Sequence, residues 1–249
     1  MKVLLLDIDG VLNEAQQPVS DKMLCALGVA SCRLPVYFVT GNGYCKAVDI
    51  VRWHGFHGMF CNMADEMRDQ YGHKVWEDLE TPALGALDSW LSECRDEIHT
   101  LGCNSIEWRG SRFLNFCPVG RNASVEQRAA HDVSWRSEFI KNMNRFFPEI
   151  EICIGGAVSV DIYSKGADKS RAAKYLNDAG HSFIFIGDKT LPGGNDYPII
   201  QYCESNVDKS NQCFTSNGPD NTLELLGQIL SGIDNEAIKR TQGAHQKTG

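Results

Sequence analysis

Short apolar runs alternate with amphipathic stretches along the N-terminal part of the chain. Residues 3–6 and 36–39 and a shorter run before Asn62 contain no polar alternation, as is typical of strands buried on both faces of a parallel sheet. Between these runs, apolar residues recur at helical spacing, and Ser20 is the expected N-cap of a helix that ends near residue 32. This β-α-β-α-β order predicts the beginning of a doubly wound α/β sheet.

The pattern changes near Pro82. Apolar residues at helical spacing predict a helix from there to about Leu101, and a second helix is expected to begin at Ser134. Two short strands are predicted before this second helix and two after it, at residues 105–109, 113–118, 149–154 and 158–163. Their partial period-two alternation suggests an antiparallel sheet with one polar face. We therefore predict a small α+β unit inserted into the first domain.

The α/β pattern resumes in the last third of the chain. Asp168 is expected to cap a helix, and residues 183–186 form a buried strand that runs directly into Asp188. A final amphipathic helix covers residues 223–233, and the polar residues from about 235 are predicted to form a frayed tail.

Together these elements predict an α/β protein with two parts. The first is a doubly wound, Rossmann-like core with a parallel sheet, formed by residues 1–80 and 166–249. The second is an α+β domain of residues 81–165, inserted into the core and built on an antiparallel sheet.

Composition narrows the function classes. The net charge of −8 over 249 residues disfavours nucleic acid as the main partner. No stretch is apolar and long enough to span a membrane, and the N-terminus lacks a signal peptide, so we expect no membrane partner and a cytoplasmic location. The ten cysteines are scattered without a C-x-x-C pair, which indicates reduced core residues rather than disulfides or zinc ligands.

The candidate chemistry lies at the ends of the predicted parallel strands. Asp7 and Asp9 follow the first strand, Thr40 the second and Asp188 the last, while Lys169 begins a helix. Ligands bind at this edge of an open α/β sheet. We predict a Mg²⁺ site formed by Asp7, Asp9 and Asp188. Asp7 is the candidate nucleophile for phosphoryl transfer and Asp9 the acid/base, while Thr40 and Lys169 are expected to hold the phosphoryl oxygens.

These residues resemble the four motifs of the haloacid dehalogenase phosphatase superfamily, in the branch with a large α+β cap inserted after the second motif. Residues 7–12, 40–42, Lys169 and 187–188 match the motifs in order. Within that branch the chain is most similar to the eukaryotic-type α-phosphomannomutases. Residues 187–196 are nearly the fourth-motif loop of that family, in which Asn195 and Asp196 are expected to support the site.

Three segments of the inserted domain carry the same resemblance, at residues 107–110, 118–128 and 154–161. By this resemblance, Arg109, Arg121 and Arg128 bind the distal phosphate of a hexose phosphate, and Ser159 and Asp161 bind sugar hydroxyls. Guanidinium groups can bind a phosphate in a bidentate manner, so the expected roles suit the residue types. Another arginine, Arg112, is expected to be a solvated surface residue.

The resemblance implies a Mg²⁺-dependent phosphomannomutase that interconverts mannose 6-phosphate and mannose 1-phosphate through a phosphoaspartate. It further implies a hexose 1,6-bisphosphate activator and a homodimer formed through the cap. The chain departs from the family at three places. Val11 replaces a threonine of the first motif, Gln16 replaces an arginine shortly after it, and Thr40-Gly41-Asn42 replaces glycine-glycine-serine in the second motif. A sugar-phosphate phosphatase of the same branch therefore remains an alternative. A non-catalytic sugar-phosphate sensor is a third hypothesis, although it would not need the acidic residues.

Overall fold

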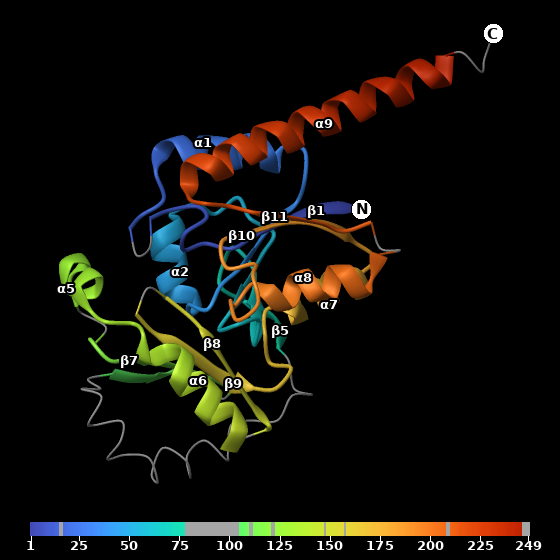
Figure 1. Cartoon of the computed structure of the whole chain (residues 1–249). Helices are drawn as coiled ribbons and strands as arrows, with labels where there is room; N and C mark the ends of the chain where they lie inside the picture. Colours follow the sequence, from blue (N-terminus) through green and yellow to red (C-terminus); the bar gives the residue numbers. More distant parts are fainter. Residues whose placement is uncertain are drawn as a thin grey trace.

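The computed structural model describes residues 1–14, 17–77, 105–109, 112–120, 123–146, 148–156, 158–207 and 210–245. Figure 1 shows an α/β core in which helices cover both sides of a sheet, and a second sheet with its own helices packed beside it. The helix predicted over residues 82–101 lies outside the described residues. None of the helices in the described part of the chain combines the length and apolar character needed to cross a bilayer.

The larger sheet has seven strands in the order β11-β10-β1-β2-β3-β4-β5. The first five are parallel, and β3, β4 and β5 form an antiparallel meander at one edge. The strand bounds are Lys2–Leu6 (β1), Val36–Val39 (β2), Gly58–Cys61 (β3), Glu66–Arg68 (β4), Lys74–Glu77 (β5), Ser182–Gly187 (β10) and Gln212–Thr215 (β11). The parallel core therefore agrees with the predicted fold class.

Five helices belong to this core. They are α1 (Asp21–Ser31), α2 (Tyr44–Val51), α7 (Ser170–Asp178), α8 (Tyr197–Ser205) and α9 (Pro219–His245). The Ser20 hydroxyl caps α1 as predicted, by accepting a hydrogen bond from the backbone N–H of Met23. The predicted frayed tail is wrong, because α9 continues to His245 and projects beyond the core in Figure 1. Residues 236–240 are mostly good helix formers, which explains the extension.

Alternate residues of the central strand serve the two faces of the sheet. Leu4 and Leu6 pack with α1, α2 and α9 on one face. Val3 and Leu5 pack with α7 and α8 on the other face. Because β1 is covered on both sides, its buried residues 3–6 are all apolar, and the residue that follows it, Asp7, emerges at the carboxyl edge of the sheet.

The smaller sheet is antiparallel, with strand order β6-β7-β9-β8. Its elements are β6 (Ser105–Trp108), β7 (Phe113–Cys117), α5 (Val125–Ala130), α6 (Trp135–Phe146), β8 (Ile150–Ile154) and β9 (Val160–Ser164). Helix α6 covers one face, where Trp135 and Phe139 pack against Leu114, Phe116 and Ile162. On the opposite face, Asn115 and Asp161 are polar, whereas Phe113 and Tyr163 pack with Met63 and Ala167.

Candidate active site

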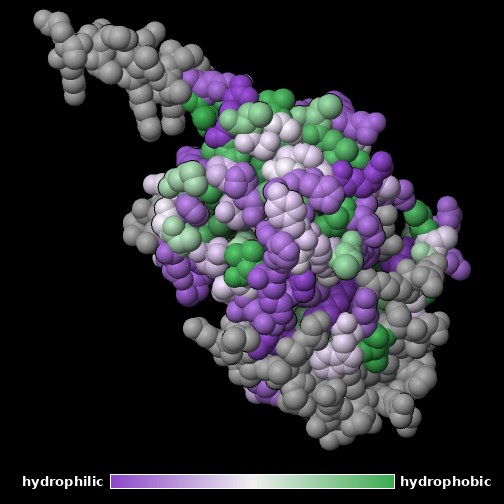
Figure 2. Space-filling view, turned by 180° about the vertical axis from the view of Figure 1, so that it is seen from behind, coloured by the Kyte–Doolittle hydropathy of each residue, from purple (hydrophilic) through white to green (hydrophobic). Residues whose placement is uncertain are grey.

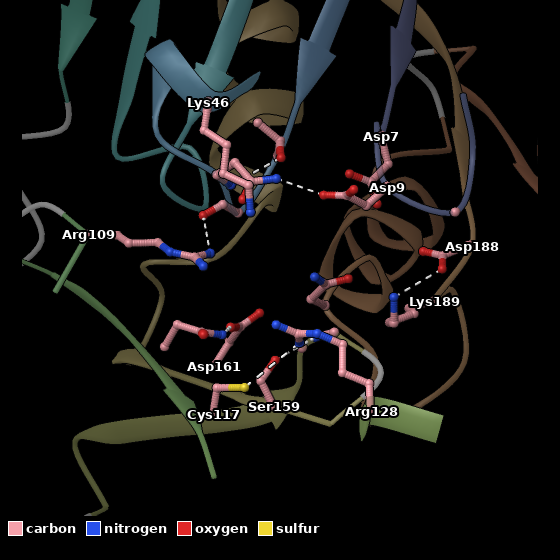
Figure 3. A pocket seen from close by; sticks show the side chains of 18 of the residues that line it. Asp7, Asp9, Lys46, Arg109, Cys117, Arg128, Ser159, Asp161, Asp188 and Lys189 are labelled. Carbon is pink, nitrogen blue, oxygen red and sulfur yellow. Dashed lines mark hydrogen bonds and ion pairs between the residues drawn. The ribbon is translucent and has the colours of Figure 1, made fainter. Parts of the chain in front are cut away.

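A cleft of about 480 Å³ lies between the smaller sheet and the carboxyl edge of the larger one. Residues from both units line it, as Figure 3 shows. Ten of the predicted site residues are among them: Asp7, Asp9, Thr40, Arg109, Arg128, Ser159, Asp161, Lys169, Asp188 and Asn195. Asp196 lies immediately behind the cleft wall. Arg121 lies outside the described residues.

Three buried or half-buried carboxylates converge at the core end of the cleft. Asp7 follows β1, Asp188 follows the neighbouring β10, and Asp196 precedes α8. One oxygen from each lies within 4.8 Å of the others. The side chain of Lys169, which is 1% exposed, contributes an ammonium 2.9 Å from Asp7 Oδ1 and 2.7 Å from Asp196 Oδ1. The predicted convergence of Asp7, Asp188 and Lys169 at one sheet edge is therefore present.

Backbone groups hold Asp196 in place. Its Oδ2 accepts hydrogen bonds from the backbone N–H groups of Asp188 (3.0 Å) and Lys189 (3.1 Å). With Lys169 on its other oxygen, Asp196 orients the ammonium that contacts Asp7. Asp196 is therefore a positioning residue between the loop after β10 and the start of α7.

Burial and neighbouring charges shift the pKa values of the acidic residues and the lysine in this cluster. Burial and the negative charge of Asp196 raise the pKa of Asp7 to about 8, although Lys169 opposes the shift. Burial also raises the pKa of Asp188. Burial lowers the pKa of Lys169, but Asp196 and Asp7 more than offset it, so its pKa lies above the usual value. Lys169 is therefore charged, while in the absence of a cation Asp7 keeps its proton up to near pH 8.

The same cluster fits a hard divalent cation. The oxygen Oδ1 of Asp188 is buried and, among the described residues, has no hydrogen-bond partner. Gly10 has a φ of +82°, and a Cβ there would lie 2.5 Å from Asp188 Oδ2. Glycine therefore allows the loop after β1 to approach Asp188 closely. Carboxylate oxygens are the ligands that Mg²⁺ prefers, so the acidic cluster is compatible with a Mg²⁺ site.

The carboxylate of Asp9 lies on the same cleft but is not part of the group that Asp7, Asp188 and Asp196 form. Its Oδ2 accepts a 2.7 Å hydrogen bond from Asn42 Nδ2. The hydroxyl oxygen of Thr40 accepts a hydrogen bond from the backbone N–H of Asn42 (3.1 Å). The turn after β2 therefore presents Thr40 to the cleft and fixes the side chain of Asp9.

The arginines of the smaller unit line the opposite side of the cleft. Arg109 of the smaller unit donates hydrogen bonds to the backbone carbonyl of Gly41 in the core (2.8 Å) and to the carboxylate of Glu107 (3.1 Å). Arg128, on α5, donates to the carbonyls of Gly120 (3.2 Å) and Ala123 (3.1 Å). Both guanidinium groups are thus oriented by backbone carbonyls, and both remain on the cleft wall.

The polar residues expected to bind sugar are also oriented by neighbours. Ser159 accepts a hydrogen bond from the backbone N–H of Gly156 (2.9 Å). Asp161 accepts one from Asn115 Nδ2 (2.7 Å), a partner directly across the β7–β9 pair. A Cβ at Gly155 would lie 2.7 Å from the Asp161 carboxylate. Ser159 and Asp161, at the start of β9, therefore both lie beside Gly155 and Gly156 on the cleft wall (Figure 3).

Sequence reasoning missed several cleft residues. Lys189 donates a 3.0 Å bond to Asp188, and Lys46, Asn115 and Cys117 also line the cleft. Lys189 could have been found from its position next to Asp188. The other three face the cleft because of how β7 pairs with its neighbours and how α2 is rotated. A sequence motif does not give this information.

The prediction for Arg112 is wrong. This side chain is 8% exposed rather than solvated, and its Nη1 lies 3.2 Å from Asp65 Oδ1. Arg171 also approaches Asp65 (3.6 Å) and donates to the carbonyl of Met63. These ion pairs connect the start of β7 with the loop after β3. Asp65 lies 47 positions before Arg112 in the chain, so the sequence around Arg112 does not indicate that it has this partner.

Comparison with known proteins shows which family the chain is similar to. A family profile described as "Eukaryotic phosphomannomutase" matches residues 90–232. The chain is 26% identical over 260 residues to a "Probable phosphomannomutase" of Caenorhabditis elegans, covering 93% of this chain and 96% of that protein. It is also 26% identical over 259 residues to a phosphomannomutase of Saccharomyces cerevisiae, covering 92% and 94%.

Solved structures give the fold. A haloacid dehalogenase-like hydrolase from Bacteroides thetaiotaomicron matches with a TM-score of 0.62 and 13% sequence identity, covering 92% of this chain and 99% of that one. The predicted fold class and the predicted family resemblance are thus confirmed.

Proposed function

The chain belongs to the eukaryotic phosphomannomutase family, and we propose that it interconverts mannose 6-phosphate and mannose 1-phosphate in a Mg²⁺-dependent reaction through a phosphorylated Asp7. One observation carries the proposal. The cluster of Asp7, Asp188 and Lys169 faces Arg128 and Asp161 across a single cleft. A phosphomutase needs an acceptor carboxylate at one end of the sugar and a phosphate-binding group at the other.

Asp7, Asp9 and Asp188 are the proposed Mg²⁺ ligands. Bound Mg²⁺ would supply the positive charge that allows an ionised carboxylate and a phosphate to approach each other. Lys169 contributes further charge next to Asp7, and Asp196 keeps that ammonium in place. Thr40 and Lys169 are the proposed donors to the phosphoryl oxygens.

In the proposed reaction, Asp7 attacks the phosphorus of a hexose 1,6-bisphosphate and becomes phosphorylated. Asp9 gives a proton to the departing sugar oxygen, and later takes one from the hydroxyl that attacks the phosphoaspartate. Its hydrogen bond from Asn42 fixes the carboxylate for both steps. The hexose 1,6-bisphosphate thereby acts as the activator that primes the enzyme.

The distal phosphate is proposed to bind Arg109, Arg121 and Arg128, while Ser159 and Asp161 bind sugar hydroxyls. Arg128 already presents a guanidinium whose orientation is set by two backbone carbonyls. Because the bisphosphate must be held in two orientations, this end has to accept either phosphate. A charged, planar group that binds phosphate without reading the sugar suits that requirement.

We further propose that residues 81–165 move as a cap on the core of residues 1–80 and 166–249. Gly166, with a φ of +83°, is a candidate hinge on the return connection. Ile106 and Trp108 on the edge strand β6 are 38% and 40% exposed. They are candidate contacts for a homodimer formed through the cap. A cytoplasmic location remains a prediction.

A sugar-phosphate phosphatase is the second candidate function. The observation in its favour is the turn Thr40–Asn42, which departs from the family motif and places an amide on Asp9. In a phosphatase, water rather than a sugar hydroxyl would accept the phosphoryl group from Asp7.

A phosphorus NMR time course tests the proposal, with mannose 1-phosphate, Mg²⁺ and catalytic glucose 1,6-bisphosphate. We expect conversion to mannose 6-phosphate that requires the bisphosphate. Release of inorganic phosphate without isomerisation would identify a phosphatase instead. Binding of the sugar phosphate without turnover, with equal affinity in the Asp7→Asn variant, would support the sensor hypothesis.

A further inference from the structure

Two half-buried cysteines from different elements face each other on the core. Cys203 lies in the last turn of α8, and Cys213 is the second residue of β11. Their sulfur atoms are 2.7 Å apart. We propose that Cys203 and Cys213 form a reversible disulfide bond on mild oxidation, a modification site separate from the cleft.

The surrounding structure already holds the two side chains in position. Both pack against the apolar cluster between the sheet and helices α7 and α8. Cys213 pairs with Phe185 of β10 in the parallel register, and Ile199 anchors α8 in the core. A disulfide sulfur–sulfur bond is about 2.05 Å long, so bond formation requires a movement of less than about 1 Å.

A shared metal ion is a poorer explanation for the pair. Structural zinc sites use four protein ligands. Within the described part of the chain, Asp7, Asp188 and Asp196 form the only group of three or more potential ligands. Cys203 and Cys213 therefore have each other as partners, without the additional ligands that a metal would need.

The thiols differ in reactivity, which sets the order of the proposed steps. The hydrogen bond between the two thiols lowers the pKa of Cys203 and raises the pKa of Cys213. The thiolate is the nucleophile in thiol–disulfide exchange. Cys203 is consequently the group that meets the oxidant first.

Glutathione disulfide can serve as the oxidant. The Cys203 thiolate attacks one sulfur of glutathione disulfide, and the sulfur–sulfur bond of glutathione disulfide breaks. Cys203 then carries one glutathione in a mixed disulfide, and the other glutathione leaves as a thiolate. Cys213 then loses its proton and attacks the Cys203 sulfur, which releases the second glutathione. The two protein thiols are thereby oxidised to one disulfide, glutathione disulfide is reduced to two glutathione thiols, and these thiols take up the two protons that the cysteines lose.

The crosslink should stabilise the fold without closing the cleft. It joins the end of α8 to β11, so it restricts the unfolded chain across the connection at residues 206–211. Neither cysteine lines the cleft. Helix α8 begins next to Asp196, and the sulfurs are already in contact, so the loop that carries Asp188 keeps its position. The inference is independent of the proposed function, because it uses no group of the active site.

Peptide mapping of the full-length protein tests the inference. The protein is incubated with glutathione disulfide, its remaining thiols are alkylated, and it is digested with trypsin without reduction. Cleavage after Lys209 separates residues 190–209, which contain Cys203, from residues 210–239, which contain Cys213. We expect these two peptides to be linked before any other cysteine pair, and dithiothreitol to release them.

The variants and the unfolding temperature complete the test. In Cys203→Ser and Cys213→Ser the remaining cysteine should retain glutathione, whereas Cys45→Ser, which removes an exposed thiol of α2, should crosslink like the wild type. Oxidation should raise the Tm of the wild type but not of Cys203→Ser. Alkylation of both cysteines at full oxidation, linkage to a different cysteine, or a lower Tm of the crosslinked wild type would each overturn the inference.

Discussion

Replacement of Asp7 by asparagine should stabilise the metal-free protein at alkaline pH. The folded state raises the pKa of Asp7 from 3.8 to about 8 through burial and the charge of Asp196. The folded protein therefore keeps a proton that the unfolded chain releases between these two values, and its stability falls as the pH rises through this window. An amide cannot ionise, so Asp7→Asn escapes this loss.

The size of the effect follows from the shift. One pKa unit corresponds to about 1.4 kcal/mol, so a shift from 3.8 to about 8 sets an upper limit of about 6 kcal/mol. Asp7 is only 4% exposed, and solvent screening reduces this value little. At about pH 5 the variant and the wild type should differ by less than about 2 kcal/mol, and by about pH 8.5 the variant should be more stable by several kcal/mol.

Urea unfolding in EDTA, followed by tryptophan fluorescence, measures the difference. Because the other titrating groups are common to both proteins, their difference reports the titration of Asp7 together with its effect on the neighbouring Lys169 and Asp196. Mg²⁺ should stabilise the wild type more at about pH 8.5 than at about pH 5, since the cation replaces the proton, and should stabilise Asp7→Asn less. A variant that gains no relative stability at the higher pH would refute the raised pKa, and equal stabilisation of both proteins by Mg²⁺ would exclude Asp7 as a ligand.

Three further predictions concern other residues. Asp9→Asn should lower kcat by a factor of about 10²–10⁴ with little change in sugar-phosphate binding; a near-normal rate would assign proton transfer to another group. Arg128→Ala should raise KM for mannose 1-phosphate by about 10-fold or more, since a charge-assisted contact of about 1.5–3 kcal/mol is lost, and an unchanged KM would place the distal phosphate elsewhere. Asp65→Asn should reduce the free energy of unfolding by about 3–5 kcal/mol, because the buried Arg112 loses its counter-charge. Glu77→Gln, at an exposed ion pair, is the control and should cost less than about 1 kcal/mol in the same urea titration.

The core was predictable because its strands carry an unambiguous pattern. β1 is buried on both faces, so its run of apolar residues predicts a strand. Asp7 is the first polar residue after this run and marks the edge of the sheet. Strands β4 and β5 were missed for the opposite reason. They form an edge meander whose residues include Glu66, Arg68 and Lys74, and such polar strands show no apolar run.

Long-range partners explain the remaining failures. Arg112 has the same sequence character as a surface arginine, and only the fold brings Asp65 to it. Cys203 and Cys213 are ten positions apart without a recognised motif, and they meet because the end of α8 lies beside the start of β11. A sequence pattern gives the burial of an element, but the partner of a single side chain depends on tertiary packing.

The charge balance of the cleft connects the proposed chemistry with the metal. Four carboxylates, from Asp7, Asp9, Asp188 and Asp196, gather at the core end, where the ammonium groups of Lys169 and Lys189 pair with Asp7, Asp196 and Asp188. A phosphate entering this end adds further negative charge. Protonation of Asp7 would relieve the repulsion but would also remove the nucleophile, because only the ionised carboxylate can attack phosphorus. A divalent cation relieves the repulsion and keeps Asp7 ionised, so the geometry that makes Asp7 a suitable acceptor also makes the proposed reaction depend on Mg²⁺.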